Sequence, residues 1–401
     1  MRILFTFAGG SGHAEPLVPV ALAARAAGHT VAFAGGASAT ASLRDRGFAT
    51  FNDPDLSSAG LATIAPLVEV DLAHEDAVLR DFYAGRSARA RAASVLALCT
   101  RWSPAVIVCD EVDFGAMIAA ERTGVPHATV LVNASGSLVR AELVSERLNE
   151  LRAEHGLAAD PRLAMLSRHL VLSPFAPSFR HPAAPLPATA HSFRPASTAD
   201  NPGDPGWRRA LPAARTIYFT LGTVFNMESG DLFTRALTGL RELPVNLIVT
   251  VGRELEPSLF GQQPANVHIA SYLPQGDVLP HCDLVVSHGG SGTLCATLTA
   301  GLPSVLLPMG ADQPGNAARC TELGLGLALD ALHCTPGDIR AAAAGVLRTP
   351  GYRLAAERVR DEVARLPGPE STVPLLAGLV HEGRCRPSDD ATHPGRESDA
   401  L

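Results

Sequence analysis

Short apolar runs alternate along the chain with longer segments in which apolar residues recur at helical spacing. The first part predicts strands at 2–8, 29–34, 104–109 and 125–131 and helices at 16–27 and 114–123. The second part predicts strands at 216–221, 245–251, 267–270, 284–287 and 304–307 and a helix at 351–366. Alternating strands and helices form parallel sheets with helices on both faces, so the pattern indicates an α/β protein with two doubly wound halves.

Three segments have a different pattern. Residues 68–97 and 138–168 carry helical patterns, whereas 174–212 is rich in Pro, Ala, Ser and Asp, as a linker is. We therefore expect a first domain, a linker, a second domain, a segment that returns to the first domain, and a disordered tail. Their expected bounds are 1–195, 196–215, 216–366, 367–380 and 381–401.

Composition narrows the class of protein. The chain has 401 residues, 46% of them hydrophobic, which suits two domains. Its net charge of -7 and its lack of a basic run argue against a nucleic-acid surface, and no apolar run is long enough to cross a bilayer. The seven cysteines are scattered without a C-x-x-C pair, which favours free thiols in a reducing compartment. We expect a cytoplasmic monomer or homodimer that binds neither nucleic acid nor membrane.

The most informative stretch follows the strand predicted at 284–287. The glycine-rich turn His288-Gly-Gly-Ser-Gly-Thr293 lies between the end of that strand and the start of a helix pattern. Backbone N–H groups and the positive end of the helix dipole meet there, and the missing side chains let an anion approach, so the turn predicts a phosphate site. The next strand delivers Asp312 and Gln313 to the same edge of the sheet. Together these residues suggest a nucleotide-sugar pocket.

A second glycine-rich turn, 9–13, follows the first strand. It fails the dinucleotide fingerprint because Glu15 stands where the third glycine is required and no acidic residue ends the next strand. His13 lies at the end of this turn, where a neutral imidazole can take a proton from a substrate hydroxyl; a helix-capping or purely structural role is the alternative. Asp53-Pro-Asp55 has the form of a metal motif, but Pro-bounded Asp pairs are common in loops, and we predict no metal site.

These motifs resemble those of the GT-B glycosyltransferases of family 1 along the whole chain. The resemblance is strongest to the actinomycete branch that glycosylates antibiotics and other secondary metabolites. It rests on G-S-G-H at 10–13, V-I-V-C-D at 106–110, F-T-L-G-T at 219–223, and H-G-G-S-G-T at 288–293 followed by P-x-x-x-D-Q-x-x-N-A at 308–317. It implies two Rossmann-like domains that face a central cleft. The second-half motifs are specific, whereas the first turn alone is a weak signal.

The resemblance also implies an activity: inverting, metal-independent transfer of a (deoxy)sugar from a dTDP- or UDP-linked donor to an aglycone such as a polyketide or enediyne. The nucleotide sugar is then a substrate, with no cofactor and no metal. His13 is implied to be the general base and Asp110 its orienting partner, while Asp113, the rival to Asp110, is assigned to the N-cap of the helix at 114–123. The implied donor residues are Thr220, Gly222, Thr223, Leu273, Gln275, His288, Gly290, Ser291, Gly292, Thr293, Asp312 and Gln313.

Within the donor set, Asp312 and Gln313 match the clamp for sugar hydroxyls, and the segment 272–275 matches the part that contacts the nucleobase. The acceptor pocket is expected in the first domain, although its candidate walls could equally be core. The candidates are Gly10, Ser11, Leu61, Ile64, Leu67, Phe82 and Tyr83. Three other activities stay open: a GT-B epimerase or phosphorylase, a transferase with a lipid acceptor, and a non-catalytic sugar-nucleotide binding partner.

Overall fold

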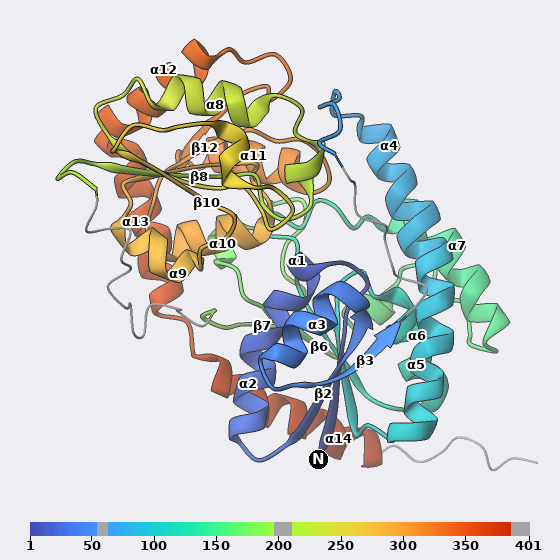
Figure 1. Cartoon of the computed structure of the whole chain (residues 1–401). Coiled ribbons are helices and arrows are strands. Elements are labelled where there is room, and N and C mark those ends of the chain that lie inside the picture. Colours follow the sequence, from blue (N-terminus) through green and yellow to red (C-terminus); the bar gives the residue numbers. More distant parts are fainter. Residues whose placement is uncertain (54–62, 196–210, 386–401) are drawn as a thin grey trace, which may run out of the picture.

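The computed structural model describes residues 1–53, 63–195 and 211–385 (Figure 1). It contains two sheets, with strand orders β3-β2-β1-β4-β5-β6-β7 and β10-β9-β8-β11-β12-β13. Neighbouring strands in both sheets run parallel. In each sheet the strand order reverses beside the first strand of that half, β1 or β8, as in doubly wound folds. The predicted α/β class with two Rossmann-like sheets is confirmed.

The first sheet and its helices fill most of the chain up to residue 195. Its strands are β1 (Arg2–Thr6), β2 (Thr30–Gly36), β3 (Ala49–Asp53), β4 (Val106–Asp110), β5 (His127–Val130), β6 (Leu170–Ser173) and β7 (Ala190–Ser192). Its α-helices are α1 (Ser11–Ala14), α2 (Val18–Ala26), α3 (Ala37–Asp45), α4 (Leu72–Ala77), α5 (Ala88–Trp102), α6 (Phe114–Thr123) and α7 (Ala141–Glu154). A π-helix, η3 (Val78–Ser87), joins α4 to α5, and 3-10 turns occupy η1 (Glu15–Leu17), η4 (Ala164–Leu166) and η5 (Pro177–Phe179).

The second sheet begins at Thr216. Its strands are β8 (Thr216–Thr220), β9 (Asn246–Thr250), β10 (Val267–Ala270), β11 (Leu284–Ser287), β12 (Ser304–Leu306) and β13 (Gly326–Ala328). The α-helices are α8 (Leu232–Leu240), α9 (Gln275–Val278), α10 (Ser291–Thr299), α11 (Gln313–Glu322), α12 (Pro336–Arg348), α13 (Pro350–Ala364) and α14 (Thr372–Cys385). The 3-10 turns are η8 (Phe225–Glu228), η9 (Pro257–Phe260), η10 (Leu279–His281) and η11 (Pro369–Ser371).

The central strands are continuous apolar runs in the sequence because the side chains on both faces of each sheet are buried. Successive side chains of a strand point to opposite faces. Phe5 of β1 packs in one apolar cluster and its neighbour Leu4 in another, and both are fully buried. In the second sheet, the neighbouring residues Phe219 and Tyr218 likewise pack in two different apolar clusters. Such two-sided burial is typical of parallel sheets and explains why periodicity alone located these strands.

The end of the described chain packs on the first domain. Helix α14 lies beside α2 (Figure 1), and Leu376 is buried in the same apolar cluster as Phe5. A further cluster joins the two halves: Phe175 and Phe179 of the first pack with Leu298 of the second. The exact domain boundaries stay a prediction.

Several elements differ from those expected. Strands β3 and β7 lie at the two edges of the first sheet and are partly exposed, so they lack an apolar run that would reveal them. Only Ala141–Glu154 of the helix expected at 138–168 forms, since the chain turns at Gly156 with φ +70°. Residues 381–385, expected in a disordered tail, continue α14. The rest of that tail lies outside the described residues.

Candidate active site

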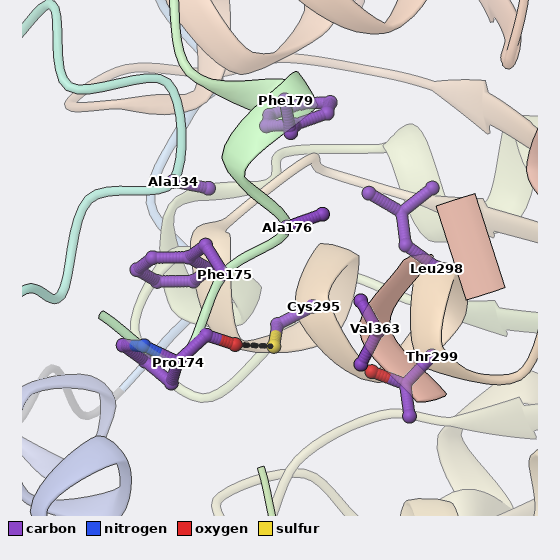
Figure 2. Close-up of a pocket in the computed structure, with 9 residues that line it drawn as sticks. All are labelled: Ala134, Pro174, Phe175, Ala176, Phe179, Cys295, Leu298, Thr299 and Val363. Atoms are coloured by element: carbon purple, nitrogen blue, oxygen red, sulfur yellow. Dashed lines mark hydrogen bonds between the residues drawn. The ribbon is translucent and has the colours of Figure 1, made fainter. Parts of the chain in front are cut away.

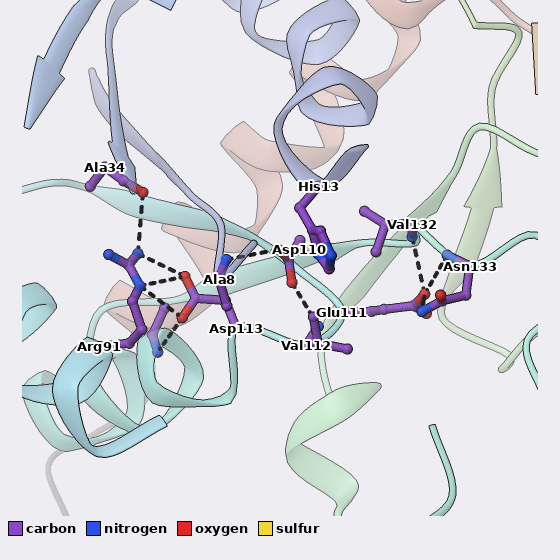
Figure 3. Close-up of polar contacts among 11 residues, drawn as sticks. Ala8, His13, Ala34, Arg91, Asp110, Glu111, Val112, Asp113, Val132 and Asn133 are labelled. Carbon is purple, nitrogen blue, oxygen red and sulfur yellow. Dashed lines mark hydrogen bonds and ion pairs between the residues drawn. The ribbon is translucent and has the colours of Figure 1, made fainter. Parts of the chain in front are cut away.

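His13 and Asp110 meet at the carboxyl edge of the first sheet (Figure 3). His13 lies inside the short helix α1 rather than in the tight turn predicted for 9–13. Its Nδ1 is 3.1 Å from Oδ2 of Asp110, the last residue of β4. Asp110 is fully buried and also accepts hydrogen bonds from the backbone N–H groups of Ala8 (2.9 Å) and Val112 (2.7 Å). With its carboxylate acting as acceptor, Nδ1 of the imidazole carries the proton and Nε2 keeps a lone pair.

Opposing effects set the pKa of His13. Burial of the ring lowers it, but the charge of Asp110 and its hydrogen bond raise it, with smaller contributions from Asp312 and Glu111. The net effect raises the pKa of His13 above its ordinary value of 6.5. A higher pKa makes the neutral ring a stronger base, but that form is populated only at correspondingly higher pH.

Glycine at position 9 makes room for the His13 ring. A Cβ at Gly9 would stand 2.1 Å from Cδ2, 2.5 Å from Nε2 and 2.6 Å from Cγ of His13. Nearly equal distances to three adjacent ring atoms place that position over a face of the imidazole. Any side chain at residue 9 would therefore displace the ring from Asp110.

The predicted phosphate turn surrounds His288, which is buried. Burial lowers its pKa to about 4, so the ring is neutral at physiological pH and offers one N–H donor. A Cβ at Gly222 or at Gly290 would stand 2.7 or 2.5 Å from its Nε2, so glycine is required on both sides. Within the described part of the chain, its Nδ1 is a buried atom without a hydrogen-bond partner. A buried ring nitrogen that lacks a partner suits a ligand contact.

The start of α10 is arranged differently from the prediction. Asp312, expected to face a sugar, accepts hydrogen bonds through Oδ2 from the backbone N–H of Ser291 (3.1 Å), from Asn316 Nδ2 (2.8 Å) and from the Ser291 hydroxyl. It thus caps α10 from a distant loop. The N–H groups of Gly292 and Thr293 precede the first helical hydrogen bond and lack intrahelical partners. They are the N–H groups of this turn that an anion could use.

The first domain contacts this turn directly. The Ser291 hydroxyl accepts a hydrogen bond from the backbone N–H of Ala134 (2.7 Å), and Asn316 Oδ1 accepts one from Ser135 (3.1 Å). Ser291 is therefore engaged in the domain interface and is not free for a phosphate through its side chain. Gln313 is buried too, and its Oε1 accepts the N–H of Met309 at 2.8 Å. Whether Asp312 and Gln313 also contact a sugar stays a prediction.

Other predicted donor residues divide into supporting and accessible positions. Thr220 is buried, and its hydroxyl accepts hydrogen bonds from the Thr250 hydroxyl (3.0 Å) and from the N–H of Gly222 (3.3 Å). It therefore supports the turn at 219–223 from its buried side. Thr223 is exposed, and its hydroxyl lies 3.1 Å from that of Ser11 in the first domain. This contact brings the two glycine-rich turns, at residues 9–13 and 219–223, within reach of each other.

The segment expected to contact a nucleobase follows β10. Gln275 donates through Nε2 to the Thr293 hydroxyl at 3.2 Å, which ties the segment to the first turn of α10. Leu273 packs partly buried against an apolar cluster. Tyr272 is half exposed, and the Arg253 guanidinium lies 4.0 Å from its ring centroid. A planar, accessible surface therefore stands at this edge of the sheet.

The expected acceptor residues separate into two groups. Ile64 and Leu67 pack against the core of the second domain, and Ala65 exchanges backbone hydrogen bonds with Met227 (2.7 Å) and Gly230 (3.0 Å) there. The chain thus crosses to the other domain at this point, and whether these residues also line an acceptor pocket stays a prediction. Leu61 lies outside the described residues. Gly10 is exposed beside Ser11, and Phe82 and Tyr83 lie together on η3.

Sequence reasoning missed two buried charged residues near this edge. Glu111 accepts hydrogen bonds through Oε1 from the N–H groups of Val132 (3.1 Å) and Asn133 (2.5 Å) and from the Asn133 side chain (Figure 3). Burial raises the pKa of Glu111 to about 7, although Arg180 and these donors lower it. It thereby holds the segment that reaches Ser291. Adjacency to Asp110 was the only signal in the sequence.

Arg91 is the second missed residue. Arg91 is fully buried and forms an ion pair with Asp113 at 2.8 Å (Figure 3). A second ion pair joins it to Asp53 at 3.1 Å. Asp113 also accepts from the N–H of Ala116, which confirms its assignment as the N-cap of α6. Asp53 is thus engaged by an arginine, and Asp55 lies outside the described residues. No sequence pattern distinguishes Arg91 from Arg89 and Arg101, which lie in the same helix.

The described ranges contain no group of three or more His, Cys, Asp or Glu side chains suited to a metal ion. Among the same residues, none of the helices combines the length and apolar character needed to cross a membrane. Their six cysteines with described side chains are free thiols. A cavity of about 10 Å³ lies between Phe175 and Phe179 of the first half and Cys295 of the second (Figure 2). It has room for about one water molecule, so it belongs to the apolar domain interface.

Comparisons with known proteins fit this geometry. A family model described as the C-terminal domain of erythromycin biosynthesis protein CIII-like proteins matches residues 234–379. The L-demethylnoviosyl transferase of Streptomyces niveus is 30% identical over 402 residues, covering 96% of this chain and 99% of that one. The TDP-daunosamine transferase DnrS of Streptomyces peucetius is 27% identical over 436 residues, covering 98% and 100%.

A solved structure of a glycosyltransferase is also similar to this chain. The glycosyltransferase SnogD from Streptomyces nogalater matches with a TM-score of 0.72 at 25% identity, over 95% of this chain and 99% of that one. The relatives match along nearly their whole length, so the similarity extends over both halves of the chain. The chain belongs to the GT-B glycosyltransferases of the actinomycete natural-product family.

Proposed function

We propose that this enzyme transfers a (deoxy)sugar, with inversion, from a nucleoside-diphosphate donor to a hydroxyl group of a small secondary-metabolite aglycone. One observation carries the proposal: the His13–Asp110 pair lies at the edge of the first sheet, and the contact of Ser11 with Thr223 links that edge to the glycine-rich turns of the second. A base in one domain and an anion site in the other are what such a transfer requires. The aglycone class includes polyketides and enediynes.

At the donor end, the leaving diphosphate gains negative charge in the transition state. The neutral His288 ring and the free N–H groups of Gly292 and Thr293 can donate to its oxygens, and the helix dipole of α10 adds to the same field. These groups are fixed before the reaction, so they stabilise the developing charge without reorganisation. We propose that they suffice without a metal, and the measurement is turnover in EDTA, which should be unchanged. Loss of turnover in EDTA, restored by Mg²⁺ or Mn²⁺, would contradict this.

At the acceptor end, Nε2 of His13 takes the proton of the attacking hydroxyl. The hydrogen bond from Nδ1–H to Asp110 keeps the correct nitrogen free and stabilises the imidazolium that forms. The hydroxyl oxygen bonds to the anomeric carbon as the bond to the diphosphate breaks, through an oxocarbenium-like state. A single displacement from the opposite face inverts the anomeric configuration.

The names of the relatives support a sugar donor linked to thymidine diphosphate. DnrS is named for the transfer of TDP-daunosamine, and the Streptomyces niveus protein for the transfer of L-demethylnoviose. We infer a dTDP- or UDP-linked donor for this chain. We also infer a cytoplasmic monomer or homodimer that uses nucleotide sugar as substrate and needs no cofactor.

The test is mass spectrometry of the enzyme incubated with a matrix of dTDP- and UDP-sugars and polycyclic or macrocyclic aglycones. The expected product is an aglycone plus one sugar, with the anomeric configuration opposite to that of the donor by NMR. Turnover of the donor without an aglycone would instead support an epimerase, and tight donor binding without any product would support a binding partner. The variant Gly9→Val is a matched negative control, since its side chain would displace the His13 ring while the donor end stays intact.

A further inference from the structure

The π-helix η3 brings an aromatic ring against His13. The rings of Tyr83 and His13 have centroids 5.9 Å apart and planes inclined by 23°, an offset-stacked arrangement. Tyr83 in turn packs edge-on against Phe82, with centroids 5.2 Å apart. Part of Tyr83 also contacts the apolar cluster beneath the helix, so the ring is held from below.

The hydrogen bond to Asp110 does not fix the His13 ring by itself. One bond at Nδ1 leaves the imidazole free to tilt about the Nδ1···Oδ2 direction, and such a tilt swings Nε2, the atom that must receive the proton. Gly9 lies over a face of the ring, and Tyr83 stacks on the ring as well. A single hydrogen bond and these packing contacts define both the position and the plane of the imidazole.

The irregular helix is what makes this contact compatible with burial. The buried residues of η3 are Leu79, Ala84 and Ser87, the last of which lies at the junction with α5. Leu79 and Ala84 are five positions apart, the spacing of the i to i+5 hydrogen bond of a π-helix. In a regular α-helix each residue is rotated by about 100° from the one before it, so the same sequence would place Tyr83 at a different angle to this buried face. π-Helical segments are rare and frequently occur at functional sites. This one keeps the helix packed on the first domain while Tyr83 reaches His13.

We propose that Tyr83 is a positioning residue for the general base: its ring fixes the plane of the His13 imidazole, so that Nε2 points at the acceptor hydroxyl. The inference rests on the proposed function, in which His13 is the base. Tyr83 acts through His13, and the phenol ring is the part that matters, since stacking needs no hydroxyl.

The charged groups around the pair agree with this role. His13 is faced by Asp110 at the end of β4, by Glu111 beside it and by Asp312 from the second domain. Burial raises the pKa of Tyr83 to about 12, with further contributions from Asp110, Asp312 and Glu75. The phenol therefore stays neutral wherever His13 titrates, and the stacked ring does not change its charge through the working pH range.

The experiment compares Tyr83→Phe, which keeps the ring, with Tyr83→Leu, which removes it, in the full-length enzyme. Tyr352→Leu is the matched control, because Tyr352 is a partly buried tyrosine in the second domain. Four quantities are measured for each: the pH profile of kcat with an alcohol acceptor, KM for the acceptor, turnover of an acidic phenol already ionised at the assay pH, and thymidine diphosphate affinity by calorimetry.

Tyr83→Phe should keep kcat within about threefold. Tyr83→Leu should lose about 10- to 100-fold in kcat on the alcohol, the size expected when a catalytic group is misplaced by about 1 Å. Its acid limb should move to lower pH, because an imidazole released into solvent returns toward its ordinary pKa. The ionised phenol, which needs no base, should react within about threefold of wild type, and diphosphate affinity should not change.

Three results would overturn the inference: an unchanged pH profile and kcat in Tyr83→Leu, equal damage in Tyr83→Phe, or a parallel loss of diphosphate affinity and of turnover on the ionised phenol. If Tyr83→Leu does not fold, Tyr83→Met gives the same comparison. Failure of the proposed function is recognised separately, by a His13→Ala enzyme that keeps full turnover on the alcohol. An inactive His13→Ala enzyme beside a normal Tyr83→Leu enzyme would refute only the role of Tyr83.

Discussion

Replacing Glu111 by Gln should make the stability of this protein less sensitive to alkaline pH. Glu111 is 8% exposed, and its Oε1 accepts two backbone N–H groups, of Val132 and Asn133. The pKa of Glu111 is raised from 4.5 to about 7, chiefly by burial, so between these values the folded state binds more protons than the unfolded state. Stability therefore falls as pH rises through this range. A glutamine keeps an acceptor oxygen for the N–H groups and does not titrate.

The magnitude follows from the difference between the two pKa values. At about 1.36 kcal/mol per pKa unit, it corresponds to about 3 kcal/mol, lost progressively as pH rises from below 4.5 to above 7. Most of that loss falls between pH 5 and pH 8. The free energy of unfolding of Glu111→Gln, taken relative to wild type, should therefore rise by about 2.5 kcal/mol from pH 5 to pH 8.

The assay is urea unfolding followed by circular dichroism at both pH values, with the free energy extrapolated linearly to water. Glu256→Gln, an exposed position, controls for the loss of a negative charge as such. A difference between Glu111→Gln and wild type that does not depend on pH, or that becomes less favourable to the variant at pH 8, would refute the reasoning. It would mean that Glu111 is ionised in the folded protein throughout this range and that its donors outweigh its burial.

Two further variants test the two ends of the site. His288→Ala should weaken nucleoside-diphosphate binding in calorimetry and slow transfer by about 10²–10³-fold, because a donor to the developing charge is lost; equal affinity and rate in this variant and in the exposed control His333→Ala would remove His288 from the donor end. Asp110→Asn should keep thymidine diphosphate affinity yet lower kcat on an alcohol by roughly 10²–10⁴-fold, because the amide no longer favours the imidazolium; steady-state kinetics that match wild type would show that Asp110 does not support the base.

Most central strands were predictable because each is buried on both faces, whereas β6, which is equally buried but only four residues long, was not predicted. Phe5 and Leu4, or Phe219 and Tyr218, require apolar residues at successive positions. Among the edge strands, β10 was predicted at 267–270, whereas β3, β7 and β13 were not. The edge strand β7 is three residues long and partly exposed, so only its pairing with β6 identifies it.

The His13–Asp110 pair could be anticipated because His13 follows β1 and Asp110 ends β4, and these neighbouring parallel strands end at one edge of the sheet. The capping of α10 by Asp312 could not. Those groups are 21 positions apart, and their meeting depends on how one loop folds over another. The crossing of Ile64 to the second domain was hidden for a similar reason, since an apolar residue packs equally well in either core.

Arg91 and the π-helix could not be predicted from the sequence for a different reason. A buried arginine between Asp53 and Asp113 is readable only once three distant segments are brought together. The helix period around Tyr83 is set by tertiary packing of Leu79 and Ala84, and the sequence there resembles an ordinary helix. The π-helix contacts the base through the stacking of Tyr83 on His13, and Arg91 pairs with Asp113, three residues after Asp110.

The central claim is that His13 is the base of a sugar transfer whose donor binds in the other domain. The measurement that tests it most directly is His13→Ala assayed twice, for thymidine diphosphate affinity by calorimetry and for single-turnover transfer to an alcohol acceptor. We predict unchanged affinity and a rate lower by roughly 10²–10⁴-fold, the usual contribution of a positioned general base. A variant that transfers at the wild-type rate, or that loses diphosphate affinity in proportion to its rate, would contradict the account.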